Sequence, residues 1–133
     1  MRAVDTNILV RLIVRDDVSQ TDRAEAFVSA SAWVSHLVLA ETVWVLQSAY
    51  GLNAEKIAVA IGMLLEHDKL ALQDEDIVRA ALNDFMRWND IGFTDCLIVR
   101  IADAMGHRPL GTFDKALSRL TSVPTISRIK SIA

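Results

Sequence analysis

Short apolar runs alternate with longer helical patterns along the sequence, and this alternation constrains the fold more than any other feature. The runs lie at residues 3–4, 32–34, 70–72 and 109–112, and each precedes a stretch with helical periodicity. Neighbouring parallel strands need helical crossovers between them. We therefore predict an α/β fold with a mostly parallel central sheet flanked by helices.

Capping residues predict where several helices begin and end. Ser19 or Thr21 can begin the second helix, whereas Ser35 and Asn53 can begin later ones. Gly51 is a typical stop signal after a helix. The predicted helices lie at about residues 8–14, 19–27, 36–50, 54–65, 74–88, 94–104 and 115–120, and a last strand is predicted around residues 123–126.

Length and composition predict one folded domain over residues 1–133. A chain of 133 residues is about one domain long, and its 52% hydrophobic content is typical of a folded protein. The net charge of −3 excludes a generally basic surface, so any nucleic-acid contact must be local. The single cysteine, Cys96, excludes an internal disulfide and fits a reducing cytoplasm.

Neither a secretory signal nor a membrane span is expected. Charged residues such as Asp5 and Arg11 interrupt the first apolar stretch. Residues 26–54 contain one charged residue, Glu41, and are long enough to cross a bilayer. However, this segment also contains several polar residues, and a carboxylate near its middle would cost about 2.5–3.5 kcal/mol on insertion.

Four carboxylates are less easily explained as ordinary surface residues. Glu41 is the only charge among residues 36–50, which predicts a buried carboxylate in a helix that is apolar all round. Asp5 and Asp114 follow predicted strands, where open α/β sheets place ligand sites. Asp95 lies in the first turn of a predicted helix, where the helix dipole alone could also explain an acid. We interpret most of the other acids as solvated residues: Asp16, Asp17, Asp22, Glu25, Glu55, Glu66, Asp68, Asp74, Glu75, Asp76, Asp84 and Asp90.

Together the four acids predict a metal site, although each has a structural explanation of its own. Glu41 could pair with a buried cation, and Asp5 and Asp114 could cap helices. If the strand ends meet at one edge, however, the clustered charges would need protonation or a cation. Oxygen ligands favour Mg²⁺ or Mn²⁺ over zinc, and the histidines lack metal-binding spacing. The corresponding chemistry is metal-assisted hydrolysis of a phosphodiester.

The motifs around these acids occur in a familiar order. They are Val-Asp-Thr-Asn at residues 4–7, Ala-Glu at 40–41, Phe-Thr-Asp-Cys-Leu-Ile at 93–98 and Thr-Phe-Asp-Lys at 112–115. Over nearly its whole length the sequence resembles PIN-domain ribonucleases, specifically the VapC-type toxins of VapBC toxin–antitoxin pairs. The resemblance implies a PIN-like three-layer sandwich with Asp5, Glu41, Asp95 and Asp114 as its catalytic acids.

The resemblance also implies an activity and partners. It implies a Mg²⁺- or Mn²⁺-dependent endoribonuclease that cuts structured RNA, such as transfer or ribosomal RNA, is inhibited by a cognate VapB-type antitoxin and forms a homodimer. Asp5, Asp95 and Asp114 would then be metal ligands, and Glu41 would orient or deprotonate the attacking water. Asn7 and Thr112 would support these ligands.

Positive and apolar side chains are candidates for contacts with the partners. Arg11 and Arg15 follow the first motif, and Lys115 and Arg119 follow the last, so these cations could contact phosphates or simply be solvated. Apolar residues within 26–50 and 57–65 could serve an antitoxin, a second copy or the core. We expect Trp33, Trp44 and Cys96 to be core residues.

Two other functions are compatible with parts of this pattern. A magnesium-dependent phosphatase of the haloacid-dehalogenase type also uses an Asp after its first strand. That chemistry requires a second carboxylate two residues later, where this chain has Asn7. A non-catalytic RNA- or protein-binding module with the same fold is the other alternative, and loss of cleavage on removal of metal or a carboxylate would distinguish it.

Overall fold

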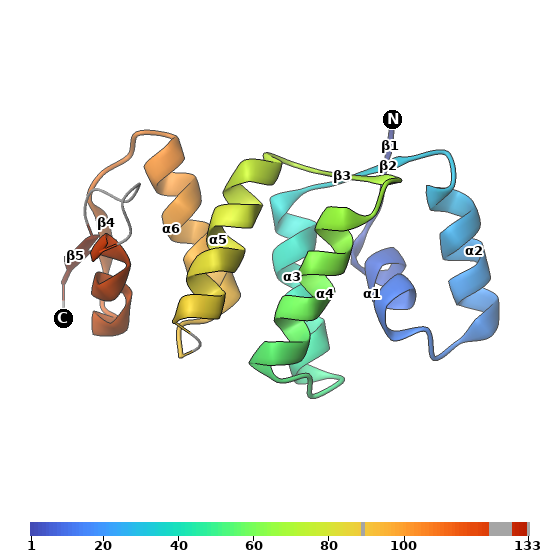
Figure 1. The fold of residues 1–133 in the computed structure, drawn as a ribbon, viewed down its shortest axis with the longest axis horizontal. Helices are drawn as coiled ribbons and strands as arrows, with labels where there is room; N and C mark the ends of the chain where they lie inside the picture. The colour runs from blue at the N-terminus through green and yellow to red at the C-terminus, as the bar shows by residue number, and fades with distance from the viewer. Residues whose placement is uncertain (89, 123–128, 133) are drawn as a thin grey trace. The chain divides into compact units, whose positions relative to one another are not determined.

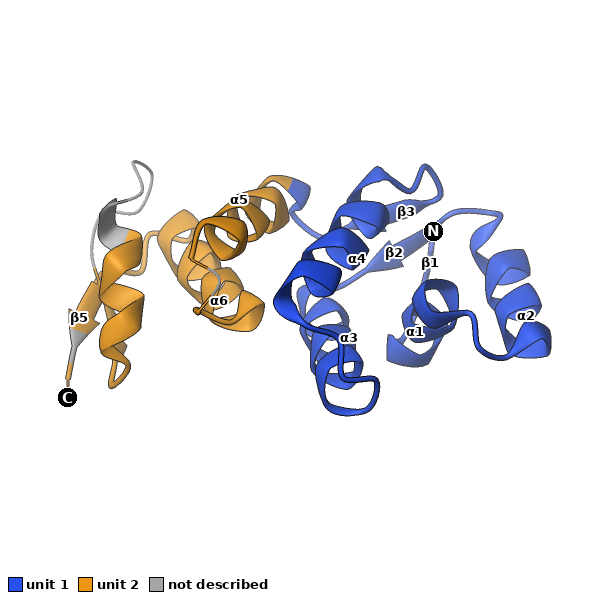
Figure 2. Ribbon diagram, turned by 60° about the horizontal axis from the view of Figure 1, so that its bottom comes forward, with its two compact units in different colours: residues 1–75 blue, residues 76–133 orange. Residues whose placement is uncertain are grey.

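The structure, a computed structural model, describes residues 1–88, 90–122 and 129–132. The chain divides into two compact units, Met1–Glu75 and Asp76–Ala133 (Figure 2). Figure 1 shows the elements in chain order: β1 (Arg2–Ala3), α1 (Thr6–Val14), α2 (Val18–Val28), β2 (Ala32–Val34), α3 (His36–Ser48), α4 (Ala54–Glu66), β3 (Leu70–Leu72), α5 (Glu75–Arg87), α6 (Phe93–Ala104), β4 (Leu110–Thr112), the 3-10 helix η1 (Lys115–Ser122) and β5 (Ile129–Ser131).

Unit 1 contains a parallel three-stranded sheet in the order β1-β2-β3. Ala32 of β2 pairs with Arg2 on one side and with Leu70 on the other. Helix α1 packs against both α2 and α3, and α4 packs against α3 and β3. The core is built from apolar residues of α1, α2, β2, α3, α4 and β3, with these side chains almost wholly buried: Leu9, Val34, Leu39, Leu46, Ile57 and Ile61.

Side-chain caps fix the starts of the helices in unit 1. Ser35 Oγ accepts a hydrogen bond from the Val38 amide, and Asn53 Oδ1 accepts one from Lys56, which confirms both predicted caps. The predicted cap of α2 is wrong: Asp17, not Ser19 or Thr21, begins this helix and accepts from the Gln20 amide at 2.9 Å. Asp17 lies two residues before Ser19, so the helix begins earlier than predicted and the Gln20 amide is the one that the cap satisfies.

Unit 2 contains α5, α6, η1 and a parallel pair of strands, β4 and β5. Phe85 of α5 and Phe93 of α6 meet edge to face, with their ring centroids 6.0 Å apart. Leu110 of β4 pairs with Ile129 of β5. The strand predicted around residues 123–126 falls outside the described residues, and β5 begins at Ile129.

The interpretation of Asp84 as a solvated acid is wrong. Its side chain, on α5, is buried, and the residue is 2% exposed. Asp84 accepts two hydrogen bonds from Arg100 of α6, at 2.7 Å from Nε and 2.8 Å from Nη2. This bidentate pair explains how an ionised carboxylate is tolerated inside unit 2, because both partners are compensated.

The expectation that Trp33 and Trp44 are core residues is also wrong. Trp44 is 65% exposed and Trp33 is 38% exposed. Helix α3 buries the face that carries Leu39 and Leu46, whereas Trp44 lies on the opposite face. Cys96 is buried, as predicted. Among the described residues, no helix is long and apolar enough to cross a membrane.

Candidate metal and nucleic-acid site

Asp5 is exposed at the start of α1, shortly after β1. Its Oδ1 accepts a hydrogen bond from the Ile8 amide at 3.3 Å, so Asp5 is the N-cap of this helix. Asn7, in the first turn, is also exposed. The cap uses one carboxylate oxygen and holds the group at the positive end of the helix dipole, which favours an anion.

Glu41 is exposed, so the prediction that it is buried is wrong. It shares the outer face of α3 with Leu37 and Trp44, and this apolar content hid the exposed face in the sequence. Thr6 Oγ1, in a residue that is 7% exposed, donates a hydrogen bond to Glu41 Oε1 at 2.7 Å. The fold therefore fixes Glu41 against the residue next to Asp5.

Asp95 and Asp114 belong to unit 2 and interact electrostatically. Burial raises the pKa of the Asp95 carboxyl, and the negative charge of Asp114 raises it further. Asp95 follows the Gly92 N-cap in the first turn of α6, where the helix dipole favours an anion, yet its pKa is still raised. A cation bound nearby would stabilise the ionised form of such an acid.

The loop after β4 holds Asp114 through two short-range hydrogen bonds. Thr112 Oγ1 accepts from the Asp114 amide at 3.0 Å, and Asp114 Oδ1 accepts from the Ala116 amide at 2.9 Å. Thr112 thus positions the backbone of Asp114, and its support of a metal ligand stays a prediction.

Each unit contains two of the predicted acids, Asp5 and Glu41 in unit 1 and Asp95 and Asp114 in unit 2. In unit 1 the Thr6 hydroxyl, next to Asp5 at the start of α1, donates a hydrogen bond to Glu41. In unit 2 the negative charge of Asp114 raises the pKa of Asp95. Within the part of the chain that the structure describes, no three histidine, cysteine, aspartate or glutamate side chains form one group that could hold a metal ion.

The predicted RNA-contacting cations differ in their surroundings. Arg11 pairs with Asp16 at 2.6 Å and donates to the Tyr50 hydroxyl, and Arg15 pairs with Glu25. Lys115 is exposed. Arg119 donates to the carboxylate of Asp90, and this hydrogen bond lowers the pKa of Asp90.

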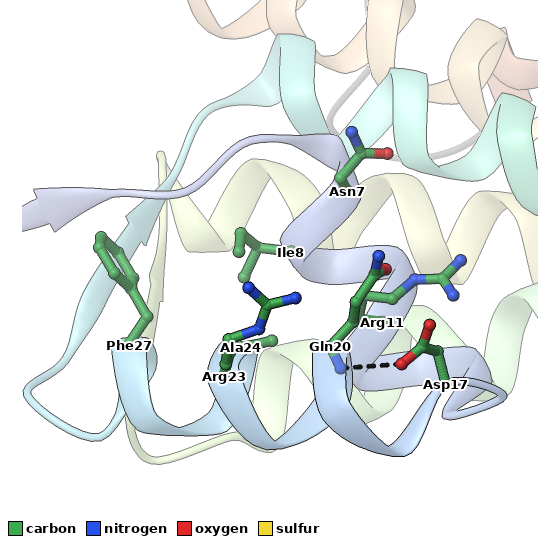
Figure 3. A pocket seen from close by; sticks show the side chains of 8 residues that line it. All are labelled: Asn7, Ile8, Arg11, Asp17, Gln20, Arg23, Ala24 and Phe27. Carbon is green, nitrogen blue, oxygen red and sulfur yellow. Dashed lines mark hydrogen bonds between the residues drawn. The ribbon is translucent and has the colours of Figure 1, made fainter.

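Sequence reasoning missed a groove between α1 and α2, of about 720 Å³ (Figure 3). Of the predicted acids and their two supporting residues, only Asn7 lines this groove. Of the four predicted phosphate contacts, only Arg11 lines it. A capped helix followed by another with polar residues on its inner face is a common pattern, so no sequence signal singled out the groove. It is lined by Asn7, Ile8, Arg11, Asp17, Gln20, Arg23, Ala24 and Phe27.

A family model described as the PIN domain matches residues 2–122, which include all four predicted acids. The chain belongs to the PIN domain family. A comparison with curated proteins finds no match. Membership confirms the predicted PIN-like α/β fold class, and it agrees with the parallel pairing in both sheets.

PIN domains are generally metal-dependent nucleases that use Mg²⁺ or Mn²⁺, so membership supports a nuclease. The donor set fits such ions, because the predicted ligands are carboxylates and hard cations prefer oxygen. The mutual repulsion of Asp95 and Asp114 fits as well, since a cation would relieve it.

Replacing Asp95 by Asn is expected to stabilise the metal-free PIN domain slightly at neutral pH. A raised pKa in the folded state means that ionisation of Asp95 opposes folding. Asp95 is only partly buried, so screening by solvent limits the gain to about 1–3 °C in Tm. The gain should vanish as the pH falls below the ordinary value of 3.8, where the carboxyl is protonated in both states. Thermal unfolding of both proteins with chelator from acid to neutral pH measures this difference, and an unchanged or lower Tm for Asp95→Asn at neutral pH contradicts it.

Proposed function

We propose that this PIN-domain chain is a Mg²⁺- or Mn²⁺-dependent endoribonuclease of the VapC toxin type, which cuts structured RNA and is restrained by a cognate antitoxin. The observation that carries the proposal is the presence of all four acids within the matched region, with two of them in each unit. In addition, Glu41 is exposed, so substrate or water can reach it, and the hydrogen bond from Thr6 holds its side chain.

In the proposed reaction Asp5, Asp95 and Asp114 would hold the divalent cation. The chemistry that the cation supplies when bound is activation of a water and stabilisation of charge on the departing oxygen. Glu41 would orient the attacking water or accept its proton, and the hydrogen bond from Thr6 limits its rotation. One oxygen of Asp5 is committed to the helix cap, which leaves the other for a ligand.

A hydrogen bond supports the role proposed for Thr112, and exposure supports the role proposed for Asn7. Thr112 would keep Asp114 in place through its backbone, as its Oγ1 contact indicates. Asn7 is exposed beside the cap residue and would contact substrate or a ligand-bound water. Arg11, Arg15, Lys115 and Arg119 remain proposed phosphate contacts, and the ion pairs of Arg11, Arg15 and Arg119 would have to open or adapt for that purpose.

Protein partners would use apolar surface. Leu37 and Trp44 on α3 and Val59 and Met63 on α4 are exposed large apolar side chains in the segments predicted to meet an antitoxin or a second copy. Large exposed apolar groups support such an interface in a protein of the cytoplasm. Growth arrest on expression, relieved by co-expression of the cognate antitoxin, tests the restraint.

The decisive experiment is incubation of the purified, antitoxin-free protein with total bacterial RNA. We expect discrete fragments with Mg²⁺ or Mn²⁺ and none with chelator, because the acids need the cation to function. Fragments that form equally well in chelator would contradict the proposal. Metal-independent binding of RNA without cleavage would instead indicate the non-catalytic module.

A further inference from the structure

The groove between α1 and α2 lies entirely within unit 1 and begins beside the proposed site. Asn7 lines it and is two residues from Asp5. Its volume of about 720 Å³ falls in the range of sites for small organic ligands, so it can hold the base and sugar of a nucleotide. A chain bound in the groove would therefore pass close to Asp5.

The charges in the groove are unequal. Asp17 uses its carboxylate to cap α2, and Arg11 is neutralised by Asp16. Arg23 is exposed, and no ion pair or hydrogen bond of its side chain is found among the residues that the structure describes. Figure 3 shows the Arg23 side chain rising from α2 toward α1, between Phe27 and Gln20. The groove thus offers one uncommitted guanidinium that a phosphate could occupy.

The remaining polar side chains fit the other parts of a nucleotide. Asn7 and Gln20 present amide groups, which can donate to and accept from the edge of a base. At the other end the groove is lined by Phe27, and bases stack on aromatic rings. One face of this ring is covered by the guanidinium of Arg2, 3.8 Å from the ring centroid, so a base would have to stack on the rest of the ring. Cation, amides and stacking surface together match nucleic acid better than a peptide.

We propose that the groove between α1 and α2 binds an unpaired stretch of RNA, with Arg23 contacting a phosphate and thereby positioning the chain for cleavage at the acids. This inference rests on the proposed ribonuclease function for its substrate. Unpaired nucleotides suit this groove because its amides would contact the edge of a base and its aromatic ring would contact the face of a base. Paired RNA hides its base faces by stacking and its base edges in a deep, narrow major groove. Arg23 is a positioning residue, since it lies outside the predicted acidic cluster.

The test is binding of a short fluorescein-labelled single-stranded RNA to the full chain in chelator, followed by anisotropy at several salt concentrations. Arg23→Gln is expected to weaken binding about fivefold and to reduce the slope of log K against log salt by about 0.7, the value for one phosphate contact on a single strand. Arg23→Lys should keep the slope of the wild type, because it keeps the charge. Lys56→Gln, which removes an exposed cation from α4 in the same unit, is the matched control and should change neither quantity.

An unchanged affinity and salt slope in Arg23→Gln would overturn the proposal. So would an effect of the same size in Lys56→Gln, because that would indicate general electrostatic attraction. Unchanged RNA binding together with weaker antitoxin binding would assign the groove to a protein and also overturn it. Since the assay needs no cleavage, an Arg23-dependent affinity in an inactive protein would retain the RNA site while the ribonuclease proposal fails.

Discussion

Asp5→Asn is expected to lower metal-dependent RNA cleavage at least about 100-fold while the protein stays folded. Replacing the carboxylate by an amide removes a negative ligand for the proposed cation, and such losses of charge stabilisation typically cost this much or more. Asn is preferred to Ala because Asp5 also caps α1 through the Ile8 amide, and Asn caps equally well. Asp5→Ala would add a loss of about 0.5–2 kcal/mol in stability and confuse the two effects.

The comparison is made on total bacterial RNA with Mg²⁺, with the unfolding curve of each protein recorded alongside. Asp68→Asn is a matched control, since its side chain is 88% exposed before β3 and has no role in the proposed site. It should cut like the wild type. Retained metal-dependent cleavage by Asp5→Asn would remove Asp5 from the proposed set of ligands, even if the protein is a nuclease.

Asp84→Ala is expected to lower the free energy of unfolding by about 3–5 kcal/mol. The substitution removes the carboxylate that accepts both hydrogen bonds from Arg100 and leaves a guanidinium charge in a residue that is 8% exposed. A loss of this size is a large part of the total stability of an ordinary domain, about 5–15 kcal/mol. Urea unfolding monitored by circular dichroism measures it.

Two variants separate the buried charge from the pair itself. Glu25→Ala breaks the half-exposed ion pair with Arg15 and should cost no more than about 1 kcal/mol. The double variant Asp84→Leu with Arg100→Met should recover much of the stability lost by Asp84→Ala, because apolar residues of similar size often replace a buried pair without loss. A cost for Asp84→Ala equal to that of Glu25→Ala would contradict the structural role given to the buried pair.

Much of the secondary structure could be predicted because its signals are local. The strands at residues 32–34 and 70–72 lie where the apolar runs predicted them, and Ser35 and Asn53 cap the helices that follow. Local signals can also be ambiguous when several capping residues lie close together. Asp17 was overlooked as a cap because Ser19 and Thr21, which have the same capping chemistry, lie within the next few residues.

Burial was harder to predict than secondary structure, because it depends on what each face of a helix meets. The apolar residues around Glu41 predicted a buried helix, yet Leu37 and Trp44 lie on an exposed face. Polar neighbours made Asp84 look solvated, although its partner, Arg100, arrives from another helix. Such long-range pairing leaves no mark in one sequence.

The candidate acids could be predicted because motifs carry them, whereas their surroundings could not. Nothing near Glu41 in the sequence indicates Thr6, which lies 35 residues away and donates to it. Arg23 and Phe27 were missed for a similar reason: the groove exists only because α2 packs against α1. Shape of this kind follows from helix packing and not from any single segment.

The burial of Cys96 gives the protein its own reporter of local opening. Burial, with smaller contributions from nearby negative charges, raises the pKa of this thiol to about 12, so its reactive thiolate is scarce in the native state. Because it is the only cysteine in the chain, an alkylating reagent has one place to react. The rate of modification therefore measures how often α6 is exposed to solvent, under native conditions and without any engineered label.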